Sequence, residues 1–326
     1  MRRRSFIALL GSTAVAWPLA ARAQQSAMPV IGYLSAGASA PTASVMAIFR
    51  QVLAEAGYVE GRNVAIEYRF AEGKYDRLPA LAAELARRHV AVIVAVPTPA
   101  AVAAKAETAS IPIAFLGAED PVRVGLVANL ARPGGHVTGA SLLFAELGPK
   151  QLRLLRELVP TATRIGLLIN PSNMNADDVT KDVTAAGAAL GLQIEVVHAS
   201  NILEIDAAFA SLVRKRADAL VAGTDSFFFN RRLQLATLAT RHGIPAVYNA
   251  REYAEAGGLM SYGTSLMEAF RQVAIYTVRI LQGAKPADLP VVQSSKFAFV
   301  INLSTARALG IEVPPTLLAR ADEVIE

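Results

Sequence analysis

The chain has 326 residues and a mass of 34.4 kDa, which is long enough for about two domains with sizeable cores. It contains no cysteine, which excludes disulfides, thiolate metal sites, a cysteine nucleophile and a lipid-modified cysteine anchor. The formal net charge is +5, but four of the positive charges lie at Arg2, Arg3, Arg4 and Arg22. That leaves +1 for the rest of the chain, where basic and acidic residues are mixed, and a nucleic-acid-binding stripe has no support.

The first residues have the pattern of an export signal. Arginines at 2–4 precede an apolar run over 6–16, and residues 21–23 read Ala-Arg-Ala, which predicts a signal peptide over 1–23 with cleavage after Ala23. The apolar run is shorter than the roughly 20 residues that span a bilayer. The stretch RRSFI is similar to the core of a twin-arginine motif and favours export in the folded state, with ordinary secretion as the alternative. We therefore expect the mature chain free in the periplasm and not embedded in a membrane.

From residue 30 onward, short β-branched runs alternate with longer amphipathic runs. Between the apolar runs, residues such as Leu152, Leu155 and Leu158 recur at helical spacing. Strand and helix in continuous succession favour parallel sheets covered on both faces, which is an α/β fold. Apolar strands are predicted over 30–35, 64–70, 90–96, 111–117, 164–170, 193–199, 218–223, 244–249 and 258–263.

The alternating unit occurs in two blocks that meet around 137–148, where a strand gives way to a new series of helices. If each block is a doubly wound lobe, ligands should bind beyond the carboxyl ends of its strands. Small and polar residues do follow the predicted strands in both blocks, at 97–99, 118–121, 171–173, 224–226 and 249. These positions are the candidate site.

The stretch VAVPTPAAVAAK at 94–105 runs from a strand into an alanine-rich helix. Thr98 suits the N-cap and Pro99 the first helical position, because proline lacks an amide that would be unpaired there. The amides of Ala100 and Ala101 would then point out of the helix end, where the helix dipole favours an anion such as a ligand carboxylate. The simpler alternative is that Thr98 only caps its own helix.

Four further positions carry groups that could contact a ligand. Asp225 follows a strand of the second block and could receive an ammonium group, although aspartate at such a place often caps the next helix. Tyr248 and Tyr262 could supply aromatic faces, or could pack in the core. Ser35 ends the first strand beside a loop of small residues, which suits close ligand approach but also an ordinary turn.

Motifs of catalysis and cofactor binding are missing. The glycines near His136 do not form a dinucleotide-binding or phosphate-binding loop, and no GxSxG or HExxH occurs. The four histidines lack metal-ligand spacing. We expect no catalytic residues, no metal and no cofactor.

The chain resembles bacterial ABC-transporter substrate-binding proteins of the type that includes tryptophan and tyrosine binders. The resemblance covers the chain from about Val30, and DPVRVGLVANLARPGGHVTG is its most specific segment; others are LAEAGYVEGRNVAIEYRFAEGKYDRLP, TPAAVAAK, IGLLINPSN, GLMSYG, RILQGAKPADLPV and VPPTLLARADEV. It implies a periplasmic binding protein type I fold, with two Rossmann-like doubly wound lobes, parallel sheets and a three-segment hinge. Lobe 1 would hold 28–142 and 258–288, and lobe 2 would hold 143–257 and 289–326.

The same resemblance implies a ligand held between the lobes. By position, 98–101 would take a ligand carboxylate and Asp225 the opposite pole, and the remainder of the cleft would be lined by Ser35, Asp120, Ser172, Asn173, Tyr248 and Tyr262. The small first loop and the doubled proline depart from the amino-acid-binding branch, so the ligand could be an amino acid or another small carboxylate.

The resemblance also implies how the protein would work. Closure of the hinge would capture the solute, and the closed form, expected to be a monomer, would dock on an inner-membrane ABC permease with its partner ATPase. A ligand-sensing module for a chemoreceptor or kinase is the alternative, and an exported enzyme is a third possibility.

Overall fold

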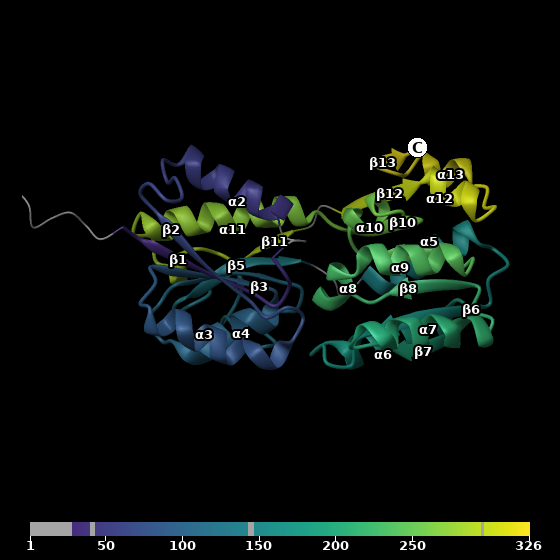
Figure 1. The fold of residues 1–326 in the computed structure, drawn as a ribbon, viewed down its shortest axis with the longest axis horizontal. Helices are drawn as coiled ribbons and strands as arrows, with labels where there is room; N and C mark the ends of the chain where they lie inside the picture. The colour runs from purple at the N-terminus through teal and green to yellow at the C-terminus, as the bar shows by residue number, and fades with distance from the viewer. Residues whose placement is uncertain (1–27, 40–42, 143–146, 295–296) are drawn as a thin grey trace, which may run out of the picture.

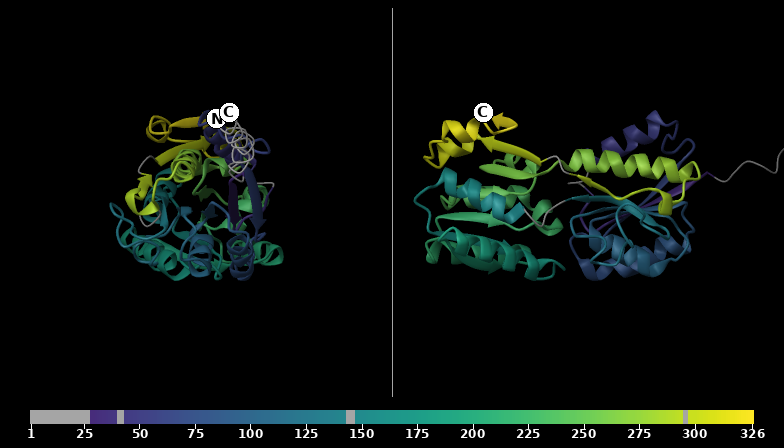
Figure 2. Two further views of the ribbon diagram at one scale, coloured as in Figure 1. Left: turned by 90° about the vertical axis from the view of Figure 1, so that its left-hand side faces the viewer. Right: turned by 180° about the vertical axis from the view of Figure 1, so that it is seen from behind.

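The computed structural model describes residues 28–39, 43–142, 147–294 and 297–326. The expected signal peptide over 1–23 lies outside these residues. Within them, no helix is both long and apolar enough to cross a membrane. The chain forms two lobes that lie side by side along the long axis of the molecule (Figures 1 and 2).

The first lobe is built on a six-stranded sheet in the order β11-β5-β4-β3-β1-β2, in which every pair is parallel. Its inner strands are buried along almost their whole length, because helices cover both faces. The strands are β1 (Val30–Ser35), β2 (Ala65–Phe70), β3 (Val92–Val96), β4 (Ile113–Gly117), β5 (Val137–Leu142) and β11 (Val292–Ser294).

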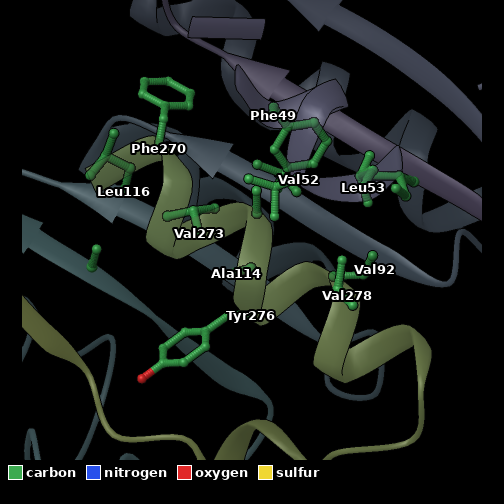
Figure 3. Packing of buried hydrophobic residues seen from close by; sticks show 14 of the residues in the cluster. Phe49, Val52, Leu53, Val92, Ala114, Leu116, Phe270, Val273, Tyr276 and Val278 are labelled. Atoms are coloured by element: carbon green, nitrogen blue, oxygen red, sulfur yellow. The ribbon is translucent and has the colours of Figure 1, made fainter. Parts of the chain in front are cut away.

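Helices α2 (Ala43–Glu55) and α11 (Leu266–Leu281) cover one face of this sheet. Phe49 of α2 and Phe270 and Val273 of α11 pack over strand residues such as Leu116, as Figure 3 shows. Helices α3 (Leu78–Arg87) and α4 (Thr98–Glu107) cover the other face. Between β2 and α3 lies a short 3-10 turn, η2 (Tyr75–Arg77).

The second lobe has a seven-stranded sheet in the order β13-β12-β10-β9-β8-β6-β7. All its pairs are parallel except β10 with β12, which run antiparallel. The predicted α/β fold with two parallel-dominated sheets is confirmed. The strands are β6 (Arg164–Ile169), β7 (Gln193–His198), β8 (Ala219–Ala222), β9 (Ala246–Tyr248), β10 (Met260–Thr264), β12 (Phe297–Asn302) and β13 (Glu323–Ile325).

Two apolar layers enclose this second sheet. One layer is formed by α5, α6, α12 and α13, and the other by α7, α8, α9 and α10. The helices are α5 (Leu147–Leu158), α6 (Ala176–Ala189), α7 (Ile202–Arg214), α8 (Ser226–Asn230), α9 (Arg232–Arg241), α10 (Arg251–Glu255), α12 (Leu303–Ala308) and α13 (Pro315–Leu318), and the 3-10 turn η3 (Pro286–Asp288) precedes β11.

The chain passes between the sheets three times: between β5 and α5, between β10 and α11, and between β11 and β12. The pairing of β10 and β11 places the last two crossings later than the expected boundaries at 257–258 and 288–289. β10 pairs with β9 and β12, so 258–264 belongs to the second lobe and not to the first. β11 pairs with β5, so 289–294 belongs to the first lobe. The backbone hydrogen bonds of these strands therefore set the last two crossings after Thr264 and after Ser294.

Candidate functional site

A cleft lies between the lobes, where the carboxyl ends of strands from both sheets face each other. At its centre is a cavity of about 80 Å³, here called the central cavity. Both lobes line it: Tyr75, Pro97, Pro99, Ala118 and Glu119 from the first, and Leu147, Gly148, Gln151, Asn173, Asn175, Val179, Val183 and 221–226 from the second.

Two further cavities adjoin the central one. The apolar cavity, of about 120 Å³, shares Pro97, Ala118 and 224–226 with it and has mostly hydrophobic walls from Val45, Val96, Leu116, Leu142, Phe229, Leu266 and Phe270. The outer cavity, of about 330 Å³, shares Ala118, Glu119, Gly148, Asn175, Val179 and Val183 with it and is otherwise lined by Asp120, Arg123, Pro149, Asp178, Lys181 and Asp182.

The start of α4 differs by one residue from the prediction. Pro97 is the N-cap, after a cis Val96–Pro97 bond, and Thr98 is the first helical residue, without a capping side-chain bond. The buried Thr98 hydroxyl instead accepts a hydrogen bond from the Ala118 amide at 3.1 Å, beyond β4. A Cβ at Gly117 would lie only 2.4 Å from Thr98 Oγ1, so this close approach requires glycine. Thr98 therefore joins α4 to the end of β4.

The expected anion site at Ala100 and Ala101 is wrong. Both side chains are buried in the first lobe, and neither residue lines the cleft. Their amides donate to the Pro97 carbonyl, at 2.9 Å and 3.3 Å. Because the helix begins at Thr98, these two amides already belong to its first turn and are not free for a carboxylate. Pro99 does line the central cavity, but it has no amide to donate.

Asp225 lies in the wall of the cleft with 6% of its surface exposed. Its Oδ1 caps α8 by accepting from the Phe227 and Phe228 amides, and it also accepts from Asn170 Nδ2. Its Oδ2 accepts from Asn173 Nδ2 at 2.9 Å and from the Tyr75 hydroxyl at 2.8 Å. Five donors therefore surround this carboxylate, and one of them comes from the other lobe.

Glu119 is the second buried carboxylate of the cleft, also 6% exposed. Its Oε1 accepts from Asn175 Nδ2 of the second lobe at 2.5 Å, and its Oε2 from the Ala118 amide at 3.2 Å. Burial raises the pKa of this carboxyl, and the Thr98 hydroxyl, the Ala118 amide and the more distant Arg123 oppose that rise only in part. Asn175 and Ala118 donate neutral N–H groups, and no basic side chain of the described residues forms an ion pair with this carboxylate.

The contacts between Tyr75 and Asp225 and between Glu119 and Asn175 bridge the two lobes. Burial, and then the neighbouring Asp225 carboxylate, raise the pKa of Tyr75 above its ordinary value, which keeps the hydroxyl as a donor. An exposed ion pair at 2.5 Å between Arg123 and Asp178 adds a third bridge beside the outer cavity. The lobes are therefore in direct contact across the cleft.

The remaining predicted residues divide into two groups. Ser35 lines the apolar cavity, where its hydroxyl accepts from the Gly37 amide, and Asn173 lines the central cavity. Asp120 is exposed, caps a turn by accepting from the Val122 amide, and reaches only the outer cavity. Ser172 is exposed and lines none of the three cavities.

Tyr248 and Tyr262 were expected in the cleft, but neither lines the three cavities: Tyr248 is buried in the second lobe, and the half-buried Tyr262 packs against its core. Tyr248 is 0% exposed and stacks on Tyr253 with ring centroids 4.5 Å apart. Tyr262 stacks on Phe297 at 5.4 Å. The alternation of side chains along a strand explains the difference, because a tyrosine at or near a strand end still points to a helix-covered face. Asn249, one residue beyond β9, does reach the apolar cavity.

Sequence reasoning missed Tyr75, Asn175 and the role of Glu119. Glu119 stands beside the predicted Asp120 within the polar stretch 118–121, and only the turn geometry decides which of the two points inward. Tyr75 and Asn175 follow a strand end by several residues, so the strand pattern gave no signal for either.

In the described structure, no group of three or more His, Cys, Asp or Glu side chains could hold a metal ion.

This chain is similar in sequence and in structure to proteins that bind amino acids. The chain is 27% identical over 264 residues to a tyrosine-binding protein of Clostridioides difficile, which covers 81% of this chain and 76% of the relative. The structure matches a Streptococcus pneumoniae ABC domain in complex with L-Trp with a TM-score of 0.80, at 27% identity over 90% of this chain and 100% of that one.

A ligand-free, open structure of a substrate-binding protein with adhesive properties from Clostridium difficile matches with a lower TM-score of 0.64. The identity is 26%, over 91% of this chain and 99% of that one. The family model described as ABC transporter substrate binding protein matches residues 42–325. This chain therefore belongs to the ABC transporter substrate-binding protein family.

Proposed function

We propose that this protein is the periplasmic solute-binding component of an ABC importer, and that it captures one small molecule in the interlobe cleft by hinge closure. The observation that carries the proposal is the position of Glu119 and Asp225. These buried carboxylates come from opposite lobes and line one cavity, which only a lobe–lobe arrangement can assemble. A solute that contacts both lobes stabilises the closed arrangement by its higher affinity for it.

The lobe arrangement supports a closed state. Tyr75 and Asp225 bond directly across the cleft. Identity and coverage are nearly equal for the two solved structures, yet the L-Trp complex matches better than the open, ligand-free structure. A difference in TM-score at equal coverage is what a different angle between two similar lobes produces.

An amino acid is the ligand class that the cleft supports best. Tyrosine and L-Trp are named for the two relatives, and the apolar cavity has the aliphatic and aromatic walls that a large apolar side chain requires. The central cavity next to it carries the polar groups. The closed form would then dock, as a monomer, on an inner-membrane permease whose ATPase supplies the energy.

A thermal-shift screen of the mature chain, starting after Ala23, against amino acids and small carboxylates tests this proposal. A ligand at 100 times its dissociation constant should add about 2.7 kcal/mol to the free energy of unfolding. We expect aromatic or large aliphatic amino acids among the hits, and no turnover of any hit. If no small molecule stabilises the protein, solute binding is rejected; if a hit is chemically converted, the enzyme alternative replaces the proposal.

A further inference from the structure

The two inner cavities carry an unbalanced charge. Glu119 and Asp225 are ionisable side chains of their walls, and among the described residues that line these cavities none is lysine, arginine or histidine. The outer cavity has two basic residues, Arg123 and Lys181, against four acidic ones, and Arg123 is paired with Asp178. The cleft is therefore acidic in a chain whose formal net charge is positive.

The two inner carboxylates differ in what they can still bind. A carboxylate has about four lone-pair sites, and Asp225 already accepts from five donors. These contacts fix α8 and join the lobes, so Asp225 has a structural task. Glu119 accepts from Asn175 and the Ala118 amide, with the Thr98 hydroxyl and its own amide as further neutral donors. It caps no helix, and it lines both the central and the outer cavity, where a ligand group can reach it.

Burial of Glu119 without a cation costs free energy. A buried carboxylate is normally paired with a cation or neutralised by a proton, because neutral donors replace only part of its hydration. Arg123, a basic side chain whose charge acts on Glu119, is 56% exposed and paired with Asp178. A positively charged group of the ligand would supply the missing partner at the centre of the cleft.

We propose that Glu119 binds an ammonium group of the ligand, and that the cleft selects compounds that carry an amine cation and rejects anions that lack one. This inference rests on the proposed solute-binding function. It replaces Asp225, the acceptor expected from the sequence, with Glu119, and it excludes simple carboxylates as the transported class. An amine with an aromatic or aliphatic body fits both the acidic central cavity and the apolar cavity beside it.

Three probes with the same phenol ring test the amine and the carboxylate of the ligand separately. L-tyrosine carries both groups, tyramine carries only the amine, and 3-(4-hydroxyphenyl)propionate carries only the carboxylate. Isothermal titration of the mature wild-type protein should show binding of at least one amine probe. The propionate should bind at least about 100-fold more weakly than that probe, since a buried charge would be left unpaired. This comparison requires no variant and does not depend on how substitutions fold.

The Glu119→Gln variant should bind the amine probe about 100-fold or more weakly than wild type. The matched Asp120→Asn variant removes the same charge from an exposed neighbour and should bind the amine probe as tightly as wild type. Circular dichroism and the thermal midpoint check that both variants are folded. The inference is overturned if neither amine probe binds, if the propionate binds as tightly as the amines, or if Glu119→Gln retains full affinity. A broad screen whose hits all lack an amine would reject this inference and leave solute binding intact.

Discussion

The two buried carboxylates of the cleft, Glu119 and Asp225, are equally exposed but have different roles. Asp225 is held by a helix cap and two asparagine amides, so its charge is stabilised by the protein itself. Glu119 has fewer donors, and burial raises its pKa. A binding protein can keep such an unfavourable group because the ligand, and not folding, satisfies it.

The raised pKa of Glu119 gives a pH-dependent prediction for the ligand-free protein. A carboxyl whose folded pKa is raised contributes stability that is complete below its unfolded pKa and is lost as the pH rises through its folded pKa. Glu119→Gln removes this loss, so its free energy of unfolding relative to wild type should increase from pH 4 to pH 7. Wild type and variant share the neighbouring charged residues Arg123, Asp178 and Asp225. The electrostatic effects of these residues are therefore present in both proteins.

Urea unfolding at several pH values measures this difference, with Asp120→Asn as the control for charge. A difference that stays constant with pH, or that falls as the pH rises, would show that Glu119 is not destabilised by burial.

At the level of helices and strands, Gln151 of α5 is a buried connection that the sequence gives no reason to expect. Its Nε2 donates to the carbonyls of Tyr248 in β9 and Tyr262 in β10, at 3.1 Å and 3.0 Å, and Gln151 itself lines the central cavity. The amide thus fixes the start of α5 against two strands of the sheet. It positions the wall of the cleft just after the first crossing between the lobes.

Replacing Gln151 with Met keeps the volume but leaves two buried carbonyls without this donor. We expect the free energy of unfolding to fall by about 1–3 kcal/mol in urea titrations. Gln193→Met, on the exposed side of β7, should change it by no more than about 0.5 kcal/mol. Equal effects of the two substitutions would mean that the bonds of Gln151 do not stabilise the lobe.

Most strands could be predicted from the sequence because a buried parallel strand is a short β-branched run. β1 matches its predicted range, and β3, β4 and β8 are each shorter by two residues. The three-residue strands β11 and β13 could not be predicted, because so few residues have no periodicity and depend on pairing with β5 and β12. The α4 helix was predicted, but a one-residue shift at its start removed the expected anion site.

For the whole molecule, the two-lobe plan could be predicted from the alternating pattern and the family resemblance. The last two crossings could not, because they depend on which sheet receives β10 and β11. The same limit applied to the site. The strand-end rule led to Asn173 and Asp225, which are hydrogen-bonded to each other in the wall of the central cavity, but Thr98 lines none of the three cavities. Pairs such as Tyr75 with Asp225 join residues 150 positions apart. Only the folded arrangement of the lobes shows such pairs.

Small-angle X-ray scattering of the mature protein, with and without the tightest ligand from the screen, measures lobe closure directly. We expect a radius of gyration that is larger for the ligand-free protein and that falls, at saturation, to the value calculated from the closed structure, because the ligand stabilises the contacts between Glu119 and Asn175 and between Tyr75 and Asp225. Tight binding with an unchanged radius of gyration would contradict capture by closure of the two lobes.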